Sequence, residues 1–298
     1  MMKNFFAAAT LIFAALLCRP AAAELKTIHS EKSLYRNIFV TEEGDLRCLT
    51  FRRATAGTRQ TCKMMSNPNH LYFPYTRMMI GSLFMKPHPG RVLIIGLGGG
   101  TLPMTVHALA PEAAIDVVEI DPAVVKAARN YFGFVTDDKI NVHEEDGRVF
   151  VKKAIAQKAQ YDLIMLDAFA DDYIPEHLLT REFLEEVKTV LAPDGVVAAN
   201  TFSSSGLYPY ESVTYAAAFG TFYNLKQANR VIWAQKNNTL PSLATLQENA
   251  KGLDAAMTER GVSSSELLSE ASTKVDWATN TRLLTDQYMP SNLLNAAR

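Results

Sequence analysis

A short apolar run that ends in a cluster of glycines limits this chain to few folds. Val92-Leu93-Ile94-Ile95 is continuously apolar, which is typical of a strand buried on both faces of a parallel sheet. Gly96-Leu97-Gly98-Gly99-Gly100 follows directly, and glycines let the backbone turn sharply and approach a ligand without a Cβ clash. A buried strand that runs into such a turn is typical of a nucleotide-binding α/β domain.

Further strand patterns come later in the chain, separated by segments with helical patterns. We expect these strands at residues 115–119, 140–142, 161–166 and 196–199. Asp121-Pro122 predicts a helix start, with Asp as N-cap and Pro at the first helical position. Another helix is expected at about residues 180–191. This alternation predicts an α/β fold with a doubly wound, Rossmann-like parallel sheet over residues 87–298.

The segment before this domain has a different pattern. Residues 38–40 and 46–51 flank the turn Glu42-Glu43-Gly44-Asp45, which predicts a β-hairpin. Residues 71–85 are apolar enough for a helix that packs against the α/β domain. Residues 24–86 are therefore expected to form a small β-rich N-terminal domain plus a linking helix.

The first 23 residues indicate an export signal. Lys3 precedes an apolar run at residues 5–17, and Ala21-Ala22-Ala23 fits signal-peptidase cleavage before Glu24. The run is shorter than the roughly 20 apolar residues of a membrane span. We therefore expect an exported, periplasmic protein, with membrane contact only if the leader stays uncleaved.

Cleavage would leave two cysteines, Cys48 and Cys62. In an oxidising compartment such a pair can form a disulfide. Two small buried hydrophobic side chains are the alternative, and the sequence leaves both open.

Composition and residue distribution argue against nucleic-acid binding and against a metal site. The chain has 30 basic and 31 acidic residues and no long basic tract, so no nucleic-acid partner is expected. The histidines are scattered and form no ligand cluster, so no metal is expected.

Acidic residues end successive strands of the predicted sheet. Glu119 lies 23 residues after Gly96, where an acid accepts hydrogen bonds from ribose hydroxyls of NAD or S-adenosylmethionine. Thr101 stands where the dinucleotide fingerprint has Gly or Ala, so NAD fits less well.

The third and fourth strands end in acids as well. Asp146 can accept from an adenine amino group while Gly147 leaves space for the ring, and Asp146 can also cap the next helix. Asp167 ends the fourth strand at the same edge. The predicted cofactor-binding residues are Gly96, Gly98, Gly100, Glu119, Asp146 and Gly147.

Several segments together resemble the spermidine-synthase-like family of polyamine aminopropyltransferases, and most closely its branch often fused to membrane transporter domains. The segments are IIGLGGGTLP, VEIDPAVVKAARNYFGF, EEDGRVFV, YDLIMLDAF, IPEHLLTREFLEEVKTVLAPDGVVAAN and the late LLTDQYMPSNLL. The resemblance implies a β-domain before a class I methyltransferase-type sheet that binds S-adenosylmethionine or its decarboxylated form. It also implies that Glu119 holds the ribose, Asp146 the adenine, and that Asp167 lies near the reacting atoms.

The sequence also departs from the family pattern. The family's glycine loop carries an Asp where this chain has Gly99, and its catalytic Asp corresponds to Ala170. Asp171 or Asp172 can replace that acid, so Asp171 is a second candidate catalytic residue beside Asp167. The family's Tyr-His/Gln-Glu segment is here Tyr75-Thr76-Arg77. Tyr75 and Arg77 are thus candidate substrate-binding residues. Arg77 either pairs with a substrate carboxylate or with a neighbouring acid such as Glu112 or Asp116.

The predicted function is transfer of an aminopropyl or related alkyl group from a sulfonium donor to a small amine or amino-acid acceptor. Methyl transfer and a non-catalytic donor-binding module are the alternatives. A homodimer is possible. Export conflicts with a donor that is made in the cytoplasm, so an exported enzyme must receive its donor there or use another.

Overall fold

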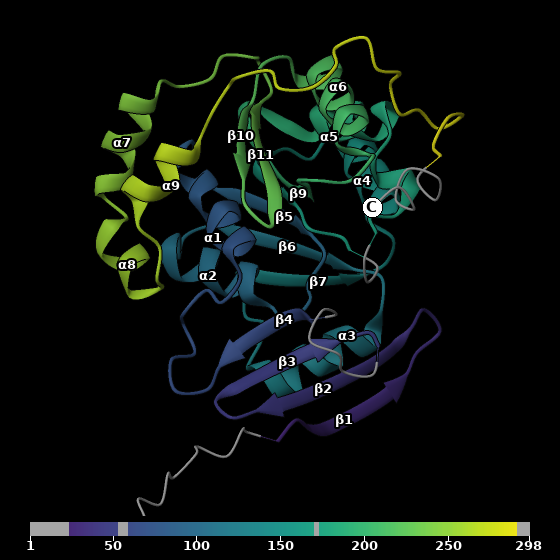
Figure 1. Ribbon diagram of the computed structural model, residues 1–298, viewed down its shortest axis with the longest axis vertical. Coiled ribbons are helices and arrows are strands. Elements are labelled where there is room, and N and C mark those ends of the chain that lie inside the picture. The colour runs from purple at the N-terminus through teal and green to yellow at the C-terminus, as the bar shows by residue number, and fades with distance from the viewer. Residues whose placement is uncertain (1–23, 53–58, 170–172, 291–298) are drawn as a thin grey trace, which may run out of the picture.

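The computed structural model describes residues 24–52, 59–169 and 173–290, which contain two sheets (Figure 1). The smaller sheet is antiparallel, with its strands in chain order. Its strands are β1 (Lys26–Lys32), β2 (Asn37–Glu43), β3 (Leu46–Thr50) and β4 (Arg59–Met64). The tight β2–β3 connection places Gly44 at φ 59°, so the predicted hairpin is confirmed.

A disulfide joins Cys48 on β3 to Cys62 on β4. The two residues are direct partners across the strands, with Cα atoms 4.1 Å apart. Both are buried. Of the two alternatives that the sequence left open, the structure contains the disulfide.

The larger sheet has the strand order β10-β11-β9-β8-β5-β6-β7. Its strands are β5 (Arg91–Ile95), β6 (Ala114–Glu119), β7 (Ile140–Glu144), β8 (Tyr161–Leu166), β9 (Leu191–Phe202), β10 (Tyr223–Lys226) and β11 (Asn229–Gln235). The first five are parallel, whereas β11 is antiparallel to β9 and β10. The predicted Rossmann-like, class I methyltransferase-type sheet after a small β-rich unit is confirmed, and the antiparallel pair β10–β11 extends it.

Helices cover both faces of this sheet, on either side of it in Figure 1. One face carries α1 (Pro74–Gly81), α2 (Thr101–Leu109), α7 (Leu243–Lys251), α8 (Asp254–Glu259) and α9 (Ser264–Glu270). The other carries α4 (Gly147–Ala156), α5 (Arg181–Val190) and α6 (Tyr208–Phe219). Among the described residues, no helix combines the length and apolar character needed to cross a membrane.

The linking helix expected at residues 71–85 is shorter and has two parts. Pro74 occupies its first turn, and α1 passes into the 3₁₀ helix η1 (Ser82–Phe84). The Trp233 indole nitrogen on β11 donates to the Met78 carbonyl at 2.9 Å. The linking segment therefore packs on the larger sheet.

Helix α3 (Pro122–Ala127) lies behind the small sheet in the view of Figure 1 and packs on it, while its Val125 belongs to the core of the larger sheet. The Asp121 side chain accepts from the Ala123 nitrogen at 3.0 Å, which confirms the predicted N-cap. A π-helical turn, η2 (Ala128–Phe132), continues α3. Apolar side chains of this helix and of β2 and β3 form a separate small core.

We expect the disulfide to contribute about 3 kcal/mol to the free energy of unfolding, because it closes a loop between residues 14 apart in sequence. Urea unfolding with and without reductant measures this difference. The double variant Cys48→Ala/Cys62→Ala serves as the control and should not respond to reductant. Equal stability of the oxidised and reduced wild-type protein would contradict the expectation.

Candidate active site

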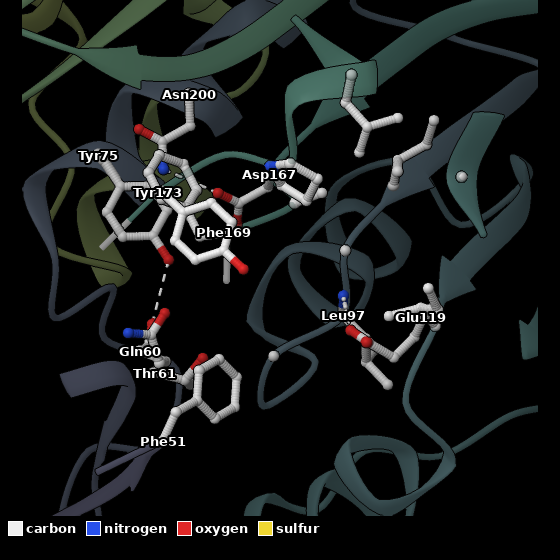
Figure 2. A pocket seen from close by; sticks show the side chains of 18 of the residues that line it. Phe51, Gln60, Thr61, Tyr75, Leu97, Glu119, Asp167, Phe169, Tyr173 and Asn200 are labelled. Atoms are coloured by element: carbon white, nitrogen blue, oxygen red, sulfur yellow. Dashed lines mark hydrogen bonds between the residues drawn. The ribbon is translucent and has the colours of Figure 1, made fainter. Parts of the chain in front are cut away.

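A cavity of about 880 Å³ opens at the carboxyl ends of the parallel strands. At this point β5 lies between β6 on one side and β8 on the other, so the chain changes direction across the sheet. Such a switch point is where open α/β sheets bind ligands. Part of the wall comes from the small sheet, whose Phe51, Gln60 and Thr61 face the cavity (Figure 2).

The glycine turn forms the floor of this cavity. Gly96 has φ +101°, and a Cβ there would lie 2.3 Å from the Asp167 carbonyl oxygen. Gly96 and Gly98, two of the predicted cofactor-binding residues, line the cavity. Gly100 is instead outside the lining and starts α2 with φ 82°, where a Cβ would press against Phe134. Glycine is therefore required at position 100 by packing against Phe134 and not by contact with a ligand.

Glu119 lies beside this turn at the end of β6. One oxygen accepts from the backbone nitrogen of Leu97 at 3.1 Å (Figure 2), and the other accepts from that of Asp121, also at 3.1 Å. Burial raises the pKa of Glu119, although the two backbone donors and the Arg36 charge oppose the shift. Each carboxylate oxygen has a further lone pair, so Glu119 can still accept from a ligand hydroxyl inside the cavity.

Asp146 has the capping role expected of it, and its second oxygen is turned to His177. Its Oδ1 accepts from the Arg148 and Val149 nitrogens at 2.9 and 3.0 Å and so caps α4. Its Oδ2 contacts His177 Nε2 at 2.7 Å. Burial opposes ionisation, yet the Val149 and His177 hydrogen bonds hold the pKa of Asp146 below its usual value.

Gly147 lines the cavity next to Asp146. A Cβ on Gly147 would lie 2.5 Å from Ile95 Cγ2, so the close packing of α4 on β5 requires glycine. His177 also lines the cavity, which the sequence did not reveal. A single histidine, here in the short 3₁₀ helix η3 (Glu176–Leu178), carries no pattern, and only its contact with Asp146 identifies it.

Asp167 follows β8 and points into the cavity near Tyr75 and Asn200 (Figure 2). Asn200 Nδ2 donates to Asp167 Oδ1 at 2.8 Å. Burial raises the pKa of Asp167 to about 7, the Asn200 hydrogen bond opposes this, and the Glu119 charge adds to it. Asp167 is therefore an acid whose proton affinity suits proton transfer near neutral pH.

Aromatic side chains surround Asp167. Phe169 and Tyr173 lie beside it, and the Tyr75 hydroxyl donates to the Gln60 carbonyl at 3.4 Å (Figure 2). Burial and the Asp167 charge raise the pKa of Tyr75 well above its usual range, so its hydroxyl stays protonated. Tyr75, a predicted substrate-binding residue, lines the cavity, and an amine can lie between these rings and the Asp167 carboxylate.

Arg36 reaches the cavity from the β1–β2 connection. Its Nη1 donates to the Phe169 carbonyl at 3.2 Å, and its guanidinium lies 4.4 Å from the centroid of the Phe51 ring. No sequence pattern selects this arginine, because its loop lies far from the glycine turn along the chain.

Arg77, in contrast, is not among the residues that line the cavity. Its Nε donates to the Leu71 carbonyl at 2.8 Å, and its Nη2 contacts His70 Nε2 at 3.3 Å. The prediction that it pairs with a substrate carboxylate, or with Glu112 or Asp116, is corrected. The guanidinium instead fixes the chain that leads into α1. Asp171, the other candidate catalytic residue, lies outside the described residues.

Gly99 marks where this chain lacks the acid of the family pattern. A Cβ there would lie 2.5 Å from Thr61 Cγ2 and 3.1 Å from the Phe132 ring. The Gly99 nitrogen donates to Thr61 Oγ1 at 3.0 Å. The small sheet therefore packs directly on this position. Within the described ranges, no group of three or more His, Cys, Asp or Glu side chains gathers in a way that suits a metal ion.

Comparison with known proteins agrees with this geometry. Residues 72–230 match the model of the spermine/spermidine synthase domain. A polyamine aminopropyltransferase of Vibrio vulnificus is 44% identical over 292 residues, which cover 95% of this chain and 97% of that protein.

Solved structures share the fold. Human methyltransferase-like protein 13, in complex with SAH, matches with a TM-score of 0.56 and 27% identity over 74% of this chain and 100% of that chain. A spermidine synthase in complex with the transition-state analogue AdoDATO matches with a TM-score of 0.58 and 21% identity over 84% of each chain. The domain match and the extent of the Vibrio vulnificus similarity place this chain in the spermine/spermidine synthase family.

Proposed function

We propose that the protein transfers an aminopropyl group from decarboxylated S-adenosylmethionine to a small amine. The observation that carries this proposal is the position of two acids on either side of the glycine turn. Glu119 and Asp167 both face the cavity, and Gly96 and Leu97 contact them through their backbones. This arrangement provides one acid for a ribose and another for a reacting amine.

In this proposal Glu119 accepts from the ribose hydroxyls and Asp146 accepts from the adenine amino group. The backbone at Gly96 and Gly98 leaves room for the sulfonium end of the donor. The Vibrio vulnificus relative is named a polyamine aminopropyltransferase, which supports the decarboxylated donor and the amine acceptor.

The chemistry requires alignment and removal of a proton. The amine nitrogen forms a bond to the aminopropyl carbon attached to sulfur, while the carbon–sulfur bond breaks and its electron pair stays on sulfur. Asp167 accepts the proton of the attacking ammonium, and a neutral thioether nucleoside leaves. A sulfonium is already an activated leaving group, so in-line positioning supplies most of the rate.

Product analysis tests the proposal directly. Incubation with decarboxylated S-adenosylmethionine and diamines should yield methylthioadenosine and an aminopropylated amine. S-adenosylhomocysteine formed from intact S-adenosylmethionine would indicate methyl transfer, the activity suggested by the similarity to methyltransferase-like protein 13. Donor binding without any product would indicate a binding module.

Replacement of Asp167 by Asn should lower kcat by about 100-fold or more, because the amide cannot accept the proton. In the wild-type protein only the carboxylate form of Asp167 is active. Its pKa of about 7 therefore predicts that kcat/KM rises as the pH increases through about 7 and then levels. A pH–rate profile of both proteins measures this, and unchanged turnover in Asp167→Asn would exclude Asp167 as the base.

We also propose that the protein is exported. The leader pattern at residues 1–23 and the Cys48–Cys62 disulfide both support an oxidising compartment. Mass spectrometry of protein purified from the native cell should find a mature chain that starts at Glu24 with both cysteines oxidised. A cytoplasmic chain that retains Met1 and carries Cys48 and Cys62 as free thiols would contradict export.

A further inference from the structure

Arg148, the second residue of α4, holds two carboxylates next to the cavity. Its Nε and Nη2 donate to Glu186 at 2.8 and 3.0 Å, and its Nη1 and Nη2 donate to Asp286 at 2.7 and 2.8 Å. The residue is only 9% exposed. Two bidentate ion pairs on one partly buried guanidinium fix its plane.

Asp286 comes from the segment after α9, far along the chain from α4. Thr180 Oγ1 donates to Asp286 Oδ1 at 2.7 Å, and the Asp286 nitrogen donates to Glu182 Oε2 at 3.0 Å. The Arg181 nitrogen donates to the Leu284 carbonyl at 2.9 Å. The C-terminal segment therefore docks on the start of α5 and on Arg148 together.

The same arginine contacts both members of the Asp146–His177 pair. Its side-chain Nη1 donates to the His177 carbonyl at 3.3 Å, and its backbone nitrogen donates to Asp146 Oδ1 at 2.9 Å. His177 in turn contacts Asp146 Oδ2 at 2.7 Å, inside the cavity lining. A displacement of Arg148 would thus move both Asp146 and His177, at the end of the cavity assigned to adenine.

We propose that Arg148, held by Asp286, is a positioning residue for the donor nucleoside, so that docking of the C-terminal segment sets the affinity for the donor. Arg148 acts through His177 and Asp146 and does not itself line the cavity. This inference rests on the proposed function, because it assumes that Asp146 and His177 lie at the nucleoside.

The variant Asp286→Asn isolates this effect. Arg148 keeps Glu186 as an ionic partner, so the substitution leaves no unpaired buried charge. The asparagine Oδ1 can still accept from Thr180, but one charge-assisted pair on Arg148 is lost. The fold is therefore expected to persist while the restraint on Arg148 weakens.

Asp276→Asn provides a matched control. Asp276 lies in the same C-terminal segment and pairs with Lys226 Nζ at 2.7 Å and with the Tyr208 hydroxyl. None of these three residues lines the cavity. The control removes the same charge from the same segment without touching the Arg148 cluster.

Calorimetric titration with methylthioadenosine tests the proposal without any need for turnover. We expect Asp286→Asn to bind this nucleoside about tenfold more weakly than the wild-type protein, as for the loss of one charge-assisted interaction. Asp276→Asn should bind it as the wild-type protein does. Kinetics should show the same tenfold rise in KM for the sulfonium donor, with kcat and the KM of the amine unchanged.

The outcomes separate the two proposals. Unchanged nucleoside affinity in Asp286→Asn overturns the positioning role, as does an equal loss in Asp276→Asn or a general fall in kcat. Absence of nucleoside binding by the wild-type protein would overturn the proposed function itself. Should Asp286→Asn fail to fold, Asp286→Glu carries the test, because it keeps the charge but shifts it by one methylene and should still weaken binding.

Discussion

Gly96 leaves β5 so close to β8 that its Cα lies against the Asp167 backbone, with no space for a Cβ. The Asp167 nitrogen donates to the Ile95 carbonyl at 2.8 Å, and the Gly96 nitrogen donates to the Val118 carbonyl at the same distance. The three central strands therefore end at one level. Because of this register, Glu119 and Asp167 flank the turn, and the Glu119 charge adds to the rise in the pKa of Asp167.

The cavity is closed by parts of the chain that are distant in sequence. The small sheet contributes Thr61 against the glycine turn, and its β1–β2 connection contributes Arg36 against Phe169. Ser33 Oγ also donates to Asp121 Oδ2 at 2.6 Å, which links that connection to the cap of α3. The larger sheet supplies the residues assigned to the donor, and the small sheet supplies much of the remaining wall.

Features set by local interactions could be predicted from the sequence. The apolar runs of the parallel strands and the Asp121 cap depend on neighbours within a few residues, and Glu119 could be placed because it ends the run of β6. Asn200, His177 and Arg36 depend on tertiary contacts, so no local pattern marked them. The prediction for Arg77 was wrong for the same reason, because the direction of its side chain depends on how the chain before α1 folds against it.

Because Gly99 contacts Thr61, the size of the side chain that one of these positions can hold depends on the residue at the other. A carboxylate side chain at residue 99 has no room while Thr61 fills the space opposite. A side chain added at residue 99 therefore requires Thr61 to move or to be replaced by a smaller residue. The shape of this side of the site is thus set jointly by the glycine turn and by β4 of the small sheet, and a replacement at residue 99 alone meets a steric barrier.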